Sequence, residues 1–234
     1  MHLDCTCQEG PTVRRCEVEL PDDSTTGVAS FLRRVGEHWQ RSMSLRWFQG
    51  GEHAVNFRVL QSLPVALLQE LELCGACTGL GELVTACPQL EKVKIERLCE
   101  DEADECFVAL GRLQSLQHLW IAVCDHSLEA FQERCLRHLK TLKSLELKIC
   151  FRTENLLNWG NFTLAGLQEF NLDSFDKRVN LTPILASGQS LQRLKVAYTK
   201  HLGEDGVLCR LPRLRFFSCG RDWGSAQDVE ELGK

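Results

Sequence analysis

Cysteine and histidine are the residue types of this chain that most readily take part in chemistry. The chain holds 13 cysteines and 7 histidines. Cys74-Gly-Ala-Cys77 has a spacing at which two thiols can hold one metal ion or form a redox pair. A structural zinc site needs two more ligands, and the sequence has no second Cys-x-x-Cys pair. A thioredoxin-type redox pair lies at a helix N-terminus in a different fold. We therefore expect neither kind of site here.

A second group of candidate metal ligands lies near the N-terminus and comprises His2, Cys5, Cys7 and Cys16. Their spacing matches no standard zinc template, so we expect no metal site and no other cofactor. The zinc content of the purified protein, measured by elemental analysis, would decide the point for these four residues.

The acidic run Glu100–Glu105 could also attract a cation, but it lacks the alternating ligands and the turn glycine of a calcium loop. It opens a predicted helix, where carboxylates offset the helix dipole and cap free amides. The sequence contains no Gly-x-Ser-x-Gly, no phosphate-binding loop, no Gly-x-Gly-x-x-Gly and no His-Glu-x-x-His. We therefore predict that the chain is not an enzyme.

Charge and hydropathy limit the partners. The 234 residues hold 27 Lys and Arg against 32 Asp and Glu, a formal charge of −5. That balance argues against nucleic acid, whose binders carry a basic excess. No apolar run of 18 residues and no apolar signal segment occur, so we expect no membrane partner. We expect reduced cysteines and a cytoplasmic or nuclear protein, because disulfides form mainly after export.

A repeat explains the 38 Leu against only 4 Ile. The frame Leu-x-x-Leu-x-Leu, with apolar residues at its first, fourth and sixth positions, starts at residues 68, 90, 116, 142, 167, 191 and 214. The spacing is therefore 22 to 26 residues, and seven matches at one period indicate a solenoid. Two weaker matches precede them, one starting at Leu45 and one at Val13.

This frame resembles the leucine-rich repeat family, and the likeness covers at least residues 65–222. Cys124 and Cys150 fill the ninth position, and Cys87-Pro-Gln-Leu90 follows a predicted helix. Both features are similar to the cysteine-containing, F-box/LRR subtype, which is related to ribonuclease inhibitor. Repeated positions that point inward suit cysteine as a small buried hydrophobic residue, and they hold Cys87, Cys106, Cys124, Cys135 and Cys150.

The spacing of the apolar residues, taken without the resemblance, predicts the same fold. The fourth and sixth frame positions share one face of a short strand. Helical spacing follows each strand, as at Leu128, Phe131, Cys135 and Leu139. It recurs at four positions of the preceding repeat, Ala103, Phe107, Leu110 and Leu113. We predict an α/β fold, a curved horseshoe with a parallel inner β-sheet and outer helices.

We expect one leucine-rich repeat domain over 1–234. Residues 1–44 would hold an N-terminal cap and an irregular first unit, residues 45–222 the repeats, and 223–234 a polar tail. The cap includes an amphipathic helix from Ser24 to Gln40, with Phe31, Val35 and Trp39 on one face.

The third, fifth and seventh frame positions point away from the helices, onto the open, concave face of the sheet. Trp120 should lie exposed in the middle of that face, and tryptophan is frequent at binding hot spots. If it binds no partner, it would pack on neighbours such as His118 or Lys94. We predict that this face binds a protein partner through Lys92, Lys94, His118, Trp120, Glu146, Lys148, Glu169, Asn171, Asp173, Arg193 and Lys195.

Three functions stay open. The first is a monomeric, non-catalytic protein-interaction module. The second is a substrate-recognition subunit of an SCF-type ubiquitin ligase, which the F-box/LRR resemblance implies. It needs an F-box, and Leu20-Pro21-Asp22-Asp23 with Phe31-Leu-Arg-Arg resembles one only faintly. The third is an inhibitor similar to ribonuclease inhibitor, whose repeats are longer and more regular.

Overall fold

The computed structural model describes residues 2–6, 15–20, 43–49, 55–56, 65–75, 77–124, 127–150, 157–158, 164–174, 179–180, 188–197, 211–220 and 229–231. The chain forms two compact units, Met1–Leu116 and Gln117–Lys234. We call them the N-terminal and the C-terminal unit. The helix predicted over Ser24–Gln40 lies outside the described residues.

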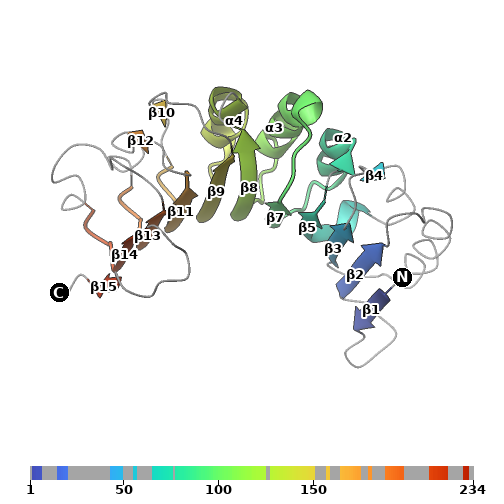
Figure 1. The fold of residues 1–234 in the computed structure, drawn as a ribbon, viewed down its shortest axis with the longest axis horizontal. Coiled ribbons are helices and arrows are strands. Elements are labelled where there is room, and N and C mark those ends of the chain that lie inside the picture. The colour runs from blue at the N-terminus through green and yellow to red at the C-terminus, as the bar shows by residue number, and fades with distance from the viewer. Residues whose placement is uncertain are drawn as a thin grey trace. The chain divides into compact units, whose positions relative to one another are not determined.

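The N-terminal unit contains a sheet with the strand order β1-β2-β3-β5-β7. Its strands are β1 (His2–Thr6), β2 (Arg15–Leu20), β3 (Met43–Gln49), β5 (Leu68–Cys74) and β7 (Lys92–Ile95). The last four run parallel, and β1 pairs with β2 in the antiparallel sense. Helices α2 (Leu80–Ala86) and α3 (Ala103–Gly111) lie on one side of this sheet (Figure 1). This unit also contains the short strands β4 (Val55–Asn56) and β6 (Cys77–Thr78) and the 3-10 turns η2 (Val65–Leu67) and η3 (Glu100–Glu102).

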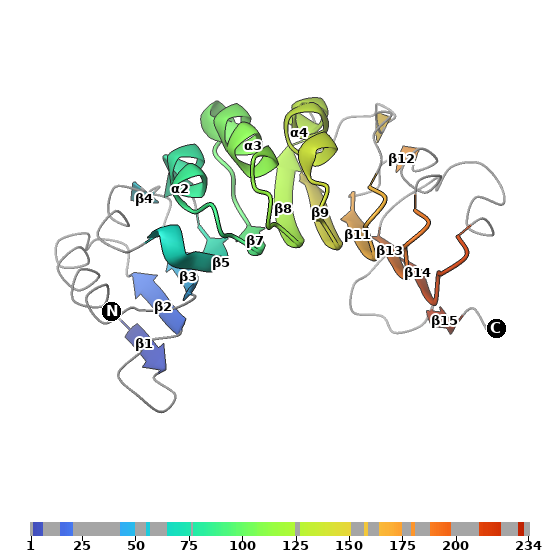
Figure 2. The same cartoon turned by 180° about the vertical axis from the view of Figure 1, so that it is seen from behind.

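The C-terminal unit continues the same pattern with the strand order β8-β9-β11-β13-β14-β15. Its strands are β8 (His118–Cys124), β9 (Ser144–Cys150), β11 (Glu169–Asp173), β13 (Arg193–Ala197), β14 (Phe216–Gly220) and β15 (Val229–Glu231). All but β15 run parallel. Helix α4 (Leu128–Arg134) and the 3-10 turn η5 (Leu136–His138) lie on one side of β8 and β9 (Figure 2). A separate pair is formed by β10 (Leu157–Asn158) and β12 (Val179–Asn180).

Strand register places equal frame positions side by side. In the C-terminal unit the fourth positions Leu119, Leu145, Phe170 and Leu194 are consecutive partners, and the sixth positions align in the same way. These residues are at most 2% exposed, and so are the first-position leucines from Leu68 to Leu191. Burying one such side chain stabilises the fold by about 1.5–3 kcal/mol. The predicted α/β fold, a leucine-rich-repeat solenoid with a parallel sheet and helices on one face, is therefore confirmed within each unit.

The register corrects one of the two weak repeats. Leu45 pairs with Leu71 and Trp47 with Leu73, so Leu45 occupies the fourth frame position rather than the first. Met43 pairs with the first-position Leu68 across a register shift, so this repeat starts at Met43, two residues earlier than predicted. The repeat at Val13 is placed correctly, because Cys16 pairs with Leu45. The frame has apolar residues at its first, fourth and sixth positions. Leu45 alone fits any of the three, so it could not fix the start of this repeat.

Helix packing follows the predicted periodicity. Phe107 and Leu110 of α3, and Phe131 of α4 with Cys135 after it, are fully buried. Gly81 lets α2 approach α3, because a Cβ there would lie 3.1 Å from the backbone carbonyl carbon of Glu105. The helices predicted for the repeats after β9 fall largely outside the described residues. No helix among the described residues is long and apolar enough to cross a membrane.

The acidic run does open α3, but one of its carboxylates caps a different helix. Glu102 accepts hydrogen bonds from the backbone N–H groups of Gly79 at 2.6 Å and Leu80 at 3.4 Å, which begin α2. Gly79 adopts a positive φ of 74°, a conformation that glycine tolerates best. The end of one helix is thus held by the following repeat.

We expect Glu102→Ala to lower the free energy of unfolding by about 1 kcal/mol, because two amides at the start of α2 lose their acceptor. Urea denaturation followed by circular dichroism measures the change. Asp101→Ala removes an exposed carboxylate of the same run and serves as control. Equal losses for the two variants would argue against the inter-repeat cap.

Both ends of the described sheet carry an antiparallel strand. β1 pairs with β2 at the N-terminal end, and β15 pairs with β14 at the C-terminal end, inside the segment that we predict to be the polar C-terminal tail. Each parallel edge is therefore covered by a short strand, which limits edge-to-edge association.

Candidate functional site

The open face of each unit is the sheet face opposite the helices, formed by the third, fifth and seventh frame positions. Along the strands, buried residues alternate with residues that are at least partly exposed, as in Ser144–Cys150 of β9. This alternation follows from the period of a strand. It places the predicted binding residues of both units on this face, which we describe separately for each unit.

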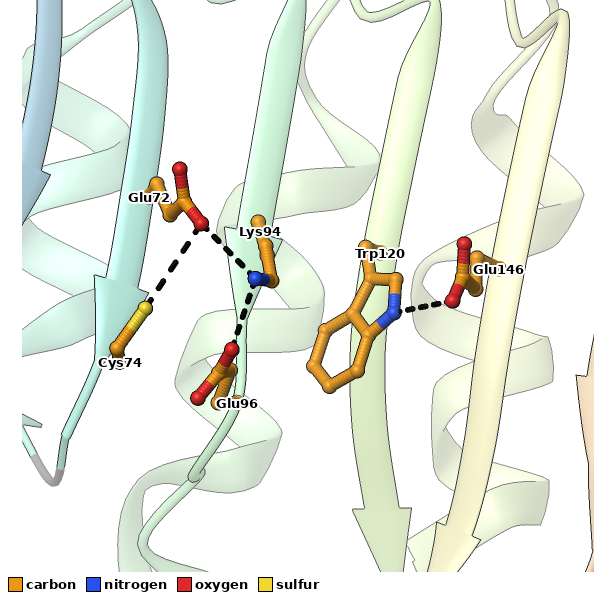
Figure 3. Close-up of polar contacts among 6 residues, drawn as sticks. All are labelled: Glu72, Cys74, Lys94, Glu96, Trp120 and Glu146. Atoms are coloured by element: carbon orange, nitrogen blue, oxygen red, sulfur yellow. Dashed lines mark hydrogen bonds and ion pairs between the residues drawn. The ribbon is translucent and has the colours of Figure 1, made fainter. Parts of the chain in front are cut away.

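In the N-terminal unit, Lys94 connects two carboxylates. Its ammonium lies 2.8 Å from Oε1 of Glu72 and 2.8 Å from Oε1 of Glu96 (Figure 3). The Cys74 thiol, on the same face, donates to Oε1 of Glu72 at 3.8 Å. Glu72 and Lys94 are both at frame position five, in the neighbouring strands β5 and β7.

The charges of this group favour an ammonium over a metal ion. The ligand atoms of Glu72, Cys74 and Glu96 lie within 4.8 Å of one another, a distance that one cation could bridge. Burial alone would lower the pKa of Lys94, but hydrogen bonds and charge from the two glutamates outweigh it and raise the pKa. Lys94 therefore supplies the positive charge that the carboxylates need.

The Cys74 thiol is also a poor metal ligand and a poor nucleophile. Burial raises its pKa to about 11, with a further contribution from the negative charge of Glu96. Metal binding and redox chemistry both need the thiolate. The structure therefore gives a physical reason to expect no redox pair at Cys74-Gly-Ala-Cys77.

We expect iodoacetamide to alkylate Cys74 about 100-fold more slowly at pH 8 than an unperturbed thiol, because a pKa near 11 leaves about 0.1% thiolate. The rate should rise about tenfold for each pH unit up to pH 10. Peptide mapping by mass spectrometry measures it. Glu96→Gln should speed the reaction, and the remote Glu105→Gln should not. A rate at pH 8 equal to that of glutathione would contradict the raised pKa.

In the C-terminal unit, Trp120 is held by its neighbour. Its indole N–H donates to Oε1 of Glu146 at 2.6 Å, and the Asn171 amide donates to Oε2 of the same carboxylate at 3.5 Å (Figure 3). The sequence predicts a largely exposed tryptophan, whereas the structure shows Trp120 half-buried. Its ring is therefore fixed in one orientation and still partly accessible.

A second chain of contacts runs along the third frame positions. Ser144 donates to Glu169 at 3.4 Å, and Arg193 lies 3.9 Å from the same carboxylate. The Arg193 guanidinium also covers the Phe216 ring, 5.1 Å from its centroid. Arg193 is 59% exposed, so this ion pair contributes little to stability. The contacts instead hold the Arg193 guanidinium and the Phe216 ring in place, so a partner would meet a cation and an aromatic ring that are already ordered.

The other predicted residues differ in accessibility. Lys92 and His118 are exposed, and Lys148 and Lys195 are half-buried. Asp173 is only 9% exposed and offers little surface to a partner. It lies at the seventh position, beside Lys148 and Ala197 in register, where the chain leaves the strand.

The five described cysteines that the sequence predicts to be buried divide into two groups. Cys87, Cys106 and Cys135 are fully buried, as predicted, and burial raises the pKa of Cys87 to about 12. Cys124 and Cys150 are half-exposed, which corrects the prediction that they are buried. They end neighbouring strands, where side chains are less covered. In the N-terminal cluster, register pairs Cys5 with Cys16, and Cys7 lies outside the described residues.

The three polar pairs between neighbouring strands were missed at the sequence level, although the frame contains the signal. Lys94 with Glu72, Trp120 with Glu146, and Arg193 with Glu169 each join equal frame positions of successive repeats. Parallel strands in register bring such residues about 5 Å apart. Reading each frame position down the repeats would have found all three.

Comparison with known proteins gives the following. No protein-family model matches the chain. No curated protein matches it. Among solved structures it is similar to an internalin C2 from Listeria monocytogenes, with 14% sequence identity and a TM-score of 0.47 over 88% of this chain and 90% of that one.

Proposed function

We propose that this chain is a non-catalytic protein-interaction module that binds a protein partner on its open sheet face. The observation that carries the proposal is Trp120, a partly accessible indole that Glu146 holds in place at 2.6 Å. A rigid aromatic side chain on a firm sheet loses little entropy on binding and fills a partner's pocket well. Arg193 over Phe216 adds a second ordered position on the same face.

The proposed contact surface keeps the predicted residues. The exposed and half-buried residues would touch the partner. Asp173 is nearly buried and would lie behind the contact surface, at the end of its strand. The contacting residues are Lys92, Lys94, His118, Trp120, Glu146, Lys148, Glu169, Asn171, Arg193 and Lys195. No cofactor enters this proposal, and the chain on its own is proposed to be a monomer formed by one repeat domain over 1–234.

Affinity capture from cell lysate tests the proposal when two variants are compared with the wild type. Trp120→Ala alters the open face, and Glu129→Ala alters an exposed residue of α4 in the same unit. A partner retained by the wild type and by Glu129→Ala but lost by Trp120→Ala supports open-face binding. Loss with Glu129→Ala alone would place the interface on the helical side.

The ubiquitin-ligase role and the cysteine-containing subtype rest on sequence resemblance. Most of the segment that would have to form an F-box, residues 21–34, lies outside the described residues. The same capture experiment separates the alternatives, because a ligase subunit should retain an Skp1-type adaptor and a cullin. An inhibitor similar to ribonuclease inhibitor should instead retain a nuclease.

A further inference from the structure

A row of cations lies outside the open face, in the segment that leads from α4 to β9. Residues 134–143 read Arg-Cys-Leu-Arg-His-Leu-Lys-Thr-Leu-Lys and contain no acidic residue. Arg134, Arg137, Lys140 and Lys143 recur at every third position, and all four are exposed. We call these four residues, with the exposed His138, the basic ridge.

The backbone under the ridge is fixed. The intervening apolar residues Cys135, Leu136, Leu139 and Leu142 are buried and anchor the segment in the core. Backbone hydrogen bonds join His138 to Cys135, Lys140 to His138, and Lys143 to the Gln117 carbonyl. The Lys143 ammonium donates to Gln117 Oε1 at 2.7 Å. The ridge therefore presents its charges from an ordered backbone.

Helix stability accounts for only part of the ridge. Cations in the last turn of a helix interact favourably with its dipole, which explains Arg134 at the end of α4. Arg137 also pairs with Glu133, one turn earlier. Lys140 and Lys143 lie beyond both helical turns, and the neighbouring turn of the next repeat, Leu164–Gln168, carries no charge. Gly166 of that turn lies against the backbone of Lys140 and Leu142.

Without the four ridge cations, the chain holds 23 Lys and Arg against 32 Asp and Glu, so its formal charge is opposite to that of the ridge. Residues 1–116 hold 11 Lys and Arg against 18 Asp and Glu, whereas residues 117–234 hold 16 against 14. Charges separated by more than about 8 Å are largely screened at physiological salt. A short anion would therefore interact with the ridge alone.

We infer that the basic ridge binds a short acidic segment of a protein partner, rich in Asp and Glu. Arginine forms paired hydrogen bonds with carboxylates, and lysine adds point charges along the row. Four cations are fewer than the roughly six to ten phosphate contacts on which strong, salt-dependent binding of nucleic acid rests. The net charge of −5 also opposes an extended polyanion or an anionic bilayer.

Fluorescence anisotropy with the full chain tests this inference. The probe is a labelled short peptide that repeats two glutamates and one serine, and the same peptide with lysine in place of glutamate is its control. The double variant Arg137→Gln/Lys140→Gln removes two ridge charges. Arg97→Gln/Arg112→Gln removes two exposed charges from the N-terminal unit. Circular dichroism confirms that both variants fold.

We expect the ridge variant to bind the acidic peptide about tenfold more weakly and the matched variant to change by less than about twofold. Binding should weaken as salt is added. Equal losses in both variants, or no binding of the acidic peptide, would overturn the inference. So would ridge-dependent binding of single-stranded DNA or of phosphatidylserine vesicles that exceeds peptide binding. A salt-sensitive dimer in sedimentation that the ridge variant no longer forms would also overturn it. The ridge would then bind the acidic run Glu100–Glu105 of a second copy.

Discussion

Leu145→Ala is expected to lower the free energy of unfolding by about 2–5 kcal/mol. Leu145 is fully buried at the fourth frame position of β9 and lies in register between Leu119 and Phe170. Truncation leaves a cavity beside β8 and β11. Neither of these strands can move to fill it, because backbone hydrogen bonds to their neighbouring strands hold both in place. Urea denaturation of the full chain, followed by circular dichroism, measures the loss.

Ser144→Ala is the control for that prediction, because Ser144 precedes Leu145 on the open face of the same strand. Its hydroxyl makes one long hydrogen bond, 3.4 Å to Glu169. We expect a change of less than about 0.5 kcal/mol. If the two variants lost equal stability, the assignment of one buried and one open face to this sheet would be wrong.

Trp120→Ala is expected to weaken partner binding by at least about 2 kcal/mol, or about thirtyfold. The aromatic surface is lost, and the Glu146 carboxylate loses its short hydrogen bond and becomes more strongly hydrated. Calorimetric titration of the captured partner measures the change. The fold should persist, because Trp120 lies on the open face, away from the buried positions of β8.

Trp120→Phe separates two contributions to that effect. Phenylalanine keeps an aromatic ring but cannot donate to Glu146, so we expect a loss smaller than that of alanine. Glu129→Ala, on α4, should leave the affinity unchanged. Wild-type affinity for Trp120→Ala would remove this residue from the interface.

The repeating core could be predicted because it depends on one periodic constraint. Leu71, Leu119 and Leu194 each fill the same frame position, and their burial follows from strand geometry. The start of the repeat at Leu45 could not be placed, because a register needs several apolar residues in a fixed pattern. Its pairing with Leu71 fixed the phase.

The candidate site was predictable in position but not in chemistry. Alternation along β8 and β9 put Trp120 and Glu146 on the open face. Their hydrogen bond required knowing that β8 and β9 pair without a shift. The role of Glu102 was harder to foresee, since it caps a helix that starts 22 residues earlier in the chain. Local sequence favours a cap on its own helix, and only the packing of α2 on α3 brings the two together.

Site-specific photo-cross-linking tests the central claim, that the open face is the binding surface. A photoreactive residue replaces either the exposed His118 on β8 or the exposed Glu129 on α4, both in the C-terminal unit. We predict that the partner cross-links to position 118 and not to position 129. Cross-linking at position 129 alone would contradict the account and move the interface to the helical side.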